Sequence, residues 1–72
     1  MLSEYDVVRL KQNLPSKGLT AGTQGTVLMV YNEPNSSRAY EVEFVDNEGN
    51  TLALVTLTED EVERVWAAPS TL

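Results

Sequence analysis

The sequence contains no cysteine and no histidine among its 72 residues. A chain without these residues forms no disulfide, carries no thiolate nucleophile and lacks the ligands of nearly all zinc and iron sites. Its serines and threonines also lack the usual base that takes the proton of a hydroxyl nucleophile. We therefore expect a protein that is not an enzyme and that uses no cofactor and no metal.

Long hydrophobic runs are absent as well. No apolar stretch approaches the roughly 20 residues needed to cross a bilayer. The N-terminal residues Met1–Asp6 are largely polar and acidic, and no basic segment precedes an apolar run, so they do not resemble a signal peptide. We expect a cytoplasmic protein without a membrane partner. The length predicts a single domain, which we place at residues 1–66, followed by a flexible tail at 67–72.

Positive charge is scarce and unevenly distributed. Five Lys and Arg residues stand against eleven Asp and Glu, for a net charge of −6. Residues 41–72 hold eight of these acids and a single cation, Arg64. Nucleic-acid binding draws most of its affinity from cations placed on phosphates. The composition therefore argues against a nucleic-acid partner and is compatible with a basic protein partner.

Five segments have the composition of β-strands. The clearest alternation runs from Arg38 to Val45, where apolar and acidic residues take turns, which predicts an inward face and a solvent face. The apolar run Val27–Tyr31 is unbroken, which predicts burial on both faces or a face covered by a partner. The predicted strands are Tyr5–Lys11, Gln24–Tyr31, Arg38–Val45, Thr51–Leu57 and Glu61–Trp66, with Tyr40, Val42 and Phe44 inward and Glu41 and Glu43 outward.

The connections between these strands carry turn signals. The polar stretch Gln12–Thr23 is long, and Leu14 and Leu19 within it predict that it folds back onto the body of the domain. Asn32–Ser37 is a turn by composition. Asp46–Asn50 is a tight reversal in which Gly49 is expected to take a positive φ.

The segment before the last strand has the Ser/Thr-x-x-Glu pattern of a capped helical start, in Thr58 to Glu61. Apolar residues follow too soon for a full helix, so we expect one 3₁₀ turn. A short amphipathic helix over Leu57–Ala68 is the alternative. Five strands, a long first loop and a 3₁₀ turn before the last strand together indicate an all-β fold, a small five-stranded SH3-like barrel.

One stretch resembles a nucleic-acid-binding fold. Ala21–Val30 is similar to the Gly-x-x-Gly-x-Val core of KOW-type barrels from ribosomal and transcription proteins, in which basic residues fill the gaps. Thr and Gln fill them here. The resemblance supports the fold and argues against RNA binding.

A second resemblance covers almost the whole chain. It is carried by Glu4–Leu10, Leu14-Pro15, Gly18-Leu19, Ala21-Gly22, Gly25–Val27, Ala39–Phe44, Val55–Leu57 and Asp60–Val62. These motifs are similar to those of a family of bacterial proteins of about this length, common in cyanobacteria and known as a domain of unknown function. The resemblance implies that the chain is encoded beside other small proteins, in gene arrangements like those of toxin–antitoxin pairs. It supplies no active site.

The leading functional hypothesis is a non-catalytic protein–protein interaction module, the acidic, antitoxin-like partner of a basic protein. The alternatives are a homo-oligomer that assembles through Val27–Tyr31 and a KOW-like nucleic-acid binder that uses Arg9, Lys11, Lys17 and Arg38. The candidate contact residues are apolar side chains that packing does not require, together with the acids of the solvent face: Tyr5, Leu19, Met29, Tyr31, Trp66, Glu41 and Glu43.

Overall fold

The structure is a computed structural model that describes residues 2–32 and 38–69. Five antiparallel strands form one sheet in the order β4-β3-β2-β1-β5. The strands are β1 (Val7–Leu10), β2 (Gln24–Tyr31), β3 (Ala39–Val45), β4 (Thr51–Thr58) and β5 (Val62–Trp66), and the 3₁₀ turns are η1 (Pro15–Lys17) and η2 (Glu59–Glu61). The described residues contain no other helix, and neither 3₁₀ turn is long and apolar enough to cross a membrane.

The predicted all-β class, the five strands and the 3₁₀ turn before the last strand are confirmed. The helical alternative over Leu57–Ala68 is wrong, because Val62–Trp66 pairs with β1 as a strand. The capping box forms as predicted: the Glu61 carboxylate accepts the Thr58 backbone N–H at 2.8 Å and the Thr58 hydroxyl at 3.0 Å. The pairings run in an open order from β4 to β5, so closure into a barrel stays a prediction.

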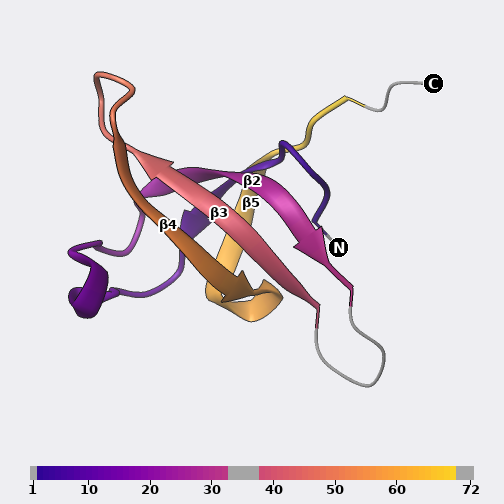
Figure 1. Cartoon of the computed structure of the whole chain (residues 1–72), viewed down its shortest axis with the longest axis horizontal. Helices are drawn as coiled ribbons and strands as arrows, with labels where there is room; N and C mark the ends of the chain where they lie inside the picture. The colour runs from indigo at the N-terminus through magenta and orange to yellow at the C-terminus, as the bar shows by residue number, and fades with distance from the viewer. Residues whose placement is uncertain (1, 33–37, 70–72) are drawn as a thin grey trace.

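Strands β2, β3 and β4 follow one another as a meander, and β1 lies between β2 and β5 (Figure 1). Only the first part of β2 pairs with β1, from Gln24 to Thr26, whereas β3 pairs with β2 as far as Tyr31. The N-terminal strand β1 and the C-terminal strand β5 therefore lie side by side at one edge of the sheet, and the hairpin of β3 and β4 lies at the opposite edge.

The core lies on one face of this curved sheet. The predicted alternation in β3 is confirmed, since Tyr40, Val42 and Phe44 are fully buried. Leu19 is 3% exposed and Leu14 packs against the core, so the long first loop does fold back onto the body as predicted. The core residues are Leu2, Val8, Leu10, Leu19, Val27, Tyr40, Val42, Phe44, Val55, Leu57 and Val62.

Burial of the Val27–Tyr31 run on both faces is not observed. The pairing register of β2 with β3 shifts between Val27 and Met29, which marks a β-bulge at Leu28. Val27 is fully buried, but Met29 is 48% exposed and Leu28 also lies at the surface. The bulge turns the strand so that an unbroken apolar run places only part of its side chains in the core.

The turns follow the sequence signals where the structure describes them. Gly49 has φ 85°, as predicted for the reversal between β3 and β4. The turn predicted at Asn32–Ser37 lies outside the described residues from position 33 onward. Residues 67–69 have no regular secondary structure, and positions 70–72 of the predicted tail also lie outside the described part of the chain.

Candidate binding surface

The outward face of β2, β3 and β4, which we call the outer face, brings together four of the predicted contact residues. Glu41 and Glu43 are both on β3 and are separated by one residue, so they point to the same side. The pairing register places Met29 of β2 beside Glu41, and Tyr31 lies two residues further along β2. The sequence alternation on β3 was sufficient to predict this arrangement of acids.

The carboxylates of the outer face are held by hydroxyl groups from the neighbouring strands. The hydroxyls of Tyr31 and Thr56 donate to the two carboxylate oxygens of Glu41, at 3.2 and 3.1 Å. The Thr51 hydroxyl donates to Glu43 at 2.7 Å. The hydrogen bond to Glu41, together with desolvation and the negative charge of Glu41, raises the pKa of Tyr31 above its ordinary value. Both carboxylates are half-buried and oriented by the protein, yet each retains lone pairs for a further donor.

An exposed apolar side chain lies beside each of these carboxylates. Met29 is 48% exposed and neighbours Glu41, and Leu54 is 55% exposed and is paired directly with Glu43. Sequence analysis did not single out Leu54, because β4 is apolar at most positions and its inward and outward residues look alike. The β3–β4 register is the signal that assigns Leu54 to the outer face.

The other predicted contact residues do not join this surface. Leu19 was predicted as a contact residue, and this prediction is wrong. Leu19 is 3% exposed and lies in the core, because the long first loop folds back onto the domain. Trp66 is 53% exposed on β5, beside Val7 of β1, and is therefore separated from Glu43 by two intervening strands. Tyr5 is 61% exposed in a turn before β1.

A buried carboxylate that sequence analysis did not single out lies between the two ends of the domain. Asp6 is 1% exposed. Its Oδ2 accepts the Ser3 N–H at 2.8 Å and the Arg64 Nε at 3.1 Å, and its Oδ1 accepts the Ala68 N–H at 2.8 Å. Because donors from the protein satisfy both oxygens, Asp6 is a structural link and not a reactive group. It also holds the first two residues of the predicted flexible tail against the domain.

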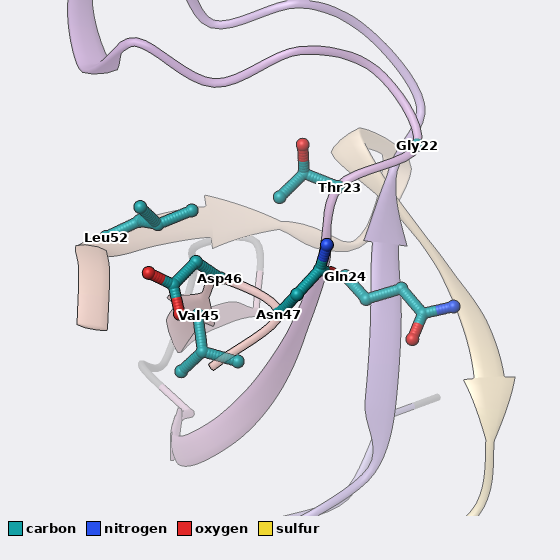
Figure 2. Close-up of a pocket in the computed structure, with 7 residues that line it drawn as sticks. All are labelled: Gly22, Thr23, Gln24, Val45, Asp46, Asn47 and Leu52. Atoms are coloured by element: carbon teal, nitrogen blue, oxygen red, sulfur yellow. The ribbon is translucent and has the colours of Figure 1, made fainter. Parts of the chain in front are cut away.

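One pocket of about 620 Å³ opens where the segment entering β2 faces the β3–β4 turn (Figure 2). Its lining residues are Gly22, Thr23, Gln24, Val45, Asp46, Asn47 and Leu52. The Asp46 carboxylate is already bound within its own turn, where Oδ1 accepts the backbone N–H groups of Glu48 and Asn50, both at 2.9 Å. These bonds, that of Asn50 foremost, hold the pKa of Asp46 below its ordinary value. Asp46 is the one titratable side chain in this lining. No group of three or more acidic residues suited to a metal occurs in residues 2–32 and 38–69.

The family model described as Domain of unknown function (DUF4926) matches residues 4–64. A search of the curated proteins and a search of the solved structures each found no match.

Proposed function

The chain belongs to the DUF4926 family, and from this premise we propose that it is a non-catalytic interaction module that binds a basic protein through its outer face. The observation that carries the proposal is the pairing of each oriented carboxylate with an exposed apolar side chain: Met29 with Glu41, and Leu54 with Glu43. A surface of this kind fits the side chain of arginine, which has an apolar stem and a charged, planar head.

The orientation of the carboxylates favours binding. Glu41 and Glu43 lie two residues apart on β3, so their Cα atoms are about 7 Å apart, which matches two basic side chains on an extended partner segment. Hydroxyl donors from both neighbouring strands already restrict Glu41, so less side-chain freedom is lost when a partner binds. The net charge of −6 would speed the encounter with a basic partner.

The proposed role is that of an acidic, antitoxin-like partner in the cytoplasm of a bacterium. The position of β1 between β2 and β5, together with η2 before β5, supports an SH3-like arrangement of the strands. Binding of nucleic acid is less well supported, because Arg9 lies 3.2 Å from Glu63 in an ion pair and the charge of the domain opposes phosphate.

The test is affinity capture from a native lysate with three versions of the chain. The wild type is compared with the double variant Glu41→Gln/Glu43→Gln and with the control Glu4→Gln/Glu48→Gln. Both variants lose two negative charges, but the control acids are exposed in turns and do not belong to β2, β3 or β4. Glutamine retains an acceptor for the threonine hydroxyls, so the domain should fold.

We expect a protein of net positive charge that the wild type and the control capture and that the Glu41→Gln/Glu43→Gln variant does not. Its binding to the purified chain should weaken as salt rises, because exposed charges are screened within about 8 Å at physiological ionic strength. Equal loss of capture by both variants would assign binding to overall charge and would contradict the proposal. Capture that is unchanged in both would exclude the outer face.

A further inference from the structure

The two edge strands of the sheet differ in how well they are protected against pairing with another strand. The edge strand β5 has five residues, of which Glu63 and Arg64 are charged, and its register with β1 shifts between Val7 and Val8. Charged side chains and bulges of this kind block the addition of a further strand. The edge strand β4 has eight residues, Thr51–Thr58, and contains no charge and no proline.

Strand β4 lies at the margin of the sheet, with β3 on one side (Figure 1). Its register with β3 is continuous from Ala53 to Thr58, and within the described parts of the chain no other strand pairs with it. Alternate backbone N–H and C=O groups along its second edge therefore have no strand partner. A long, uncharged, apolar edge of this kind is a template for strand addition.

We propose that β4 pairs in antiparallel fashion with β4 of a second copy of this chain, about a two-fold axis, so that two sheets become one. Antiparallel pairing of a strand with itself is self-complementary, as a two-fold axis requires. When Leu54 lies opposite its own copy, Leu52 lies opposite Thr56 and Ala53 opposite Val55. Inward and outward faces then remain continuous across the interface, and every opposed pair is uncharged.

The charge distribution favours a second copy over a charged partner at this edge. The chain carries a net charge of −6, which opposes self-association in general. Within the sheet, however, the acids nearest to this edge are on β3, where Glu43 is paired with Leu54, and the remaining nearby acids, Glu48, Glu59 and Asp60, lie beyond the ends of β4. The two copies of Glu43 would be three strand spacings apart, about 14 Å, which is longer than the physiological screening length of about 8 Å.

Pairing would also cover apolar side chains that the single chain leaves in water. Leu52 is 51% exposed and Leu54 is 55% exposed. Apolar cross-strand pairs contribute to sheet stability, and Leu54 would contact its own copy. A contact between single strands is small as interfaces go, so we expect a dimer with a dissociation constant of about 1–100 µM.

This interface differs from the surface proposed for the basic partner. It uses the backbone edge of β4, whereas the partner would bind side chains of the outer face. It also differs from assembly through Val27–Tyr31, because β3 already occupies one edge of β2 along that stretch. In the dimer the two outer faces become parts of one sheet surface. Leu54 belongs to both interfaces and would contact its own copy, whereas Met29, Glu41 and Glu43 would stay uncovered.

The test measures the oligomeric state of the full chain by sedimentation equilibrium and native mass spectrometry over a range of concentrations. The variant Leu54→Lys places two ammonium groups opposite each other across the proposed interface. The control Met29→Lys introduces the same charge at a similarly exposed position of the outer face, away from the edge. Each introduced lysine lies beside a glutamate of its own chain, Glu43 or Glu41, so both variants should fold.

We expect the wild type and Met29→Lys to dimerise as concentration rises, and Leu54→Lys to raise the dissociation constant by about tenfold or more. Hydrogen exchange of the wild type gives a second reading, in which amides of residues 51–58 become protected as concentration rises. A wild type that is monomeric at about 1 mM would overturn the proposal. So would a dimer that Leu54→Lys leaves intact, or one that Met29→Lys weakens equally.

Discussion

The hydroxyl of Tyr40 donates a hydrogen bond of 2.5 Å to the carboxylate of Glu59, and this bond joins the core strand β3 to the 3₁₀ turn η2. The same hydroxyl accepts the backbone N–H of Leu2 at 3.4 Å. The ring of Tyr40 is fully buried. One phenol therefore connects the N-terminal segment, the core and the turn that leads into β5.

Removal of this hydroxyl in Tyr40→Phe should destabilise the domain by about 1–2 kcal/mol, because the phenol no longer accepts from the Leu2 N–H and no longer donates to Glu59. The control is Tyr31→Phe, which also removes one hydroxyl from a Tyr–Glu hydrogen bond. There the carboxylate of Glu41 keeps its bond to Thr56, and the ring is only half-buried. Urea denaturation should show the larger fall in midpoint for Tyr40→Phe; equal effects would contradict the role assigned to Tyr40.

The same bond predicts how stability changes at high pH. Burial, followed by the hydrogen bond to Glu59, raises the pKa of Tyr40 above its ordinary value of 10.0. A group whose pKa is raised by folding stabilises the fold fully below its unfolded pKa, and this contribution is lost as the pH rises through the folded pKa. Stability should therefore fall above about pH 10, and Tyr40→Phe should reduce that fall. Thermal denaturation at a series of pH values measures both.

Four carboxyl groups of the described residues have a pKa lowered by folding, those of Asp46, Glu59, Asp60 and Asp6, and of these only Asp6 is buried. Burial opposes its ionisation, but the N–H groups of Ser3 and Ala68 and the guanidinium of Arg64 outweigh burial and hold the pKa of Asp6 below its ordinary value of 3.8. A lowered pKa stabilises the fold above the unfolded value, and this stabilisation is lost as the pH falls through the folded value. The hydrogen bond from Tyr40 also holds the pKa of Glu59 below its ordinary value of 4.5, so protonation of Glu59 adds to the same loss of stability at low pH.

The variant Asp6→Asn should lower stability near neutral pH by about 2–4 kcal/mol, because an amide group faces N–H donors and Arg64 loses its counter-charge. It should also flatten the loss of stability below about pH 4. The control Glu63→Gln removes one member of the exposed pair with Arg9, whose side chains are both 51% exposed, and should change little. If the stability of Asp6→Asn falls as steeply at low pH as that of the wild type, ionisation of Asp6 does not cause the fall.

Local sequence signals were enough to predict most of the architecture. The alternation of Arg38–Val45 defines which residues of β3 enter the core, and Thr58 to Glu61 carries its capping pattern within four residues. Each of these signals depends on neighbours in the chain. The same is true of Gly49, whose positive φ follows from the composition of its turn.

The features that sequence analysis missed depend on distant partners or on backbone irregularity. Asp6 and Arg64 are 58 residues apart, and only the pairing of β1 with β5 brings them together. Tyr5 was predicted to begin the first strand, but it has φ 71° and lies in a turn, with its N–H bonded to the carbonyl of Val27 at 2.6 Å. Composition does not reveal a left-handed tyrosine, because this conformation is disfavoured for its side chain.

A final prediction concerns Gly25 of β2, which is paired with Phe44 of β3. A Cβ atom at this position would lie 2.7 Å from the carbonyl oxygen of Glu43, 2.8 Å from a ring carbon of Phe44 and 2.8 Å from a methyl carbon of Val42. These distances are shorter than van der Waals contact, and the neighbours are buried or part of the backbone. Glycine is therefore required at position 25 because there is no room for a side chain. At Gly49 the reason is different: the space is open, but the backbone has a positive φ.

The variant Gly25→Ala should destabilise the domain by about 1–3 kcal/mol, the usual cost of overpacking a core, and lower Tm by about 4–8 °C for each kcal/mol. Thermal denaturation of Gly25→Ala, Val42→Ala and the double variant tests the cause. Truncation of Val42 removes one of the three clashing groups, so the double variant should lose about 0.5–1 kcal/mol less stability than the two single losses together. A neutral Gly25→Ala would mean that the strands can separate at this point without cost, and strict additivity would mean that Val42 is not one of the groups that clash.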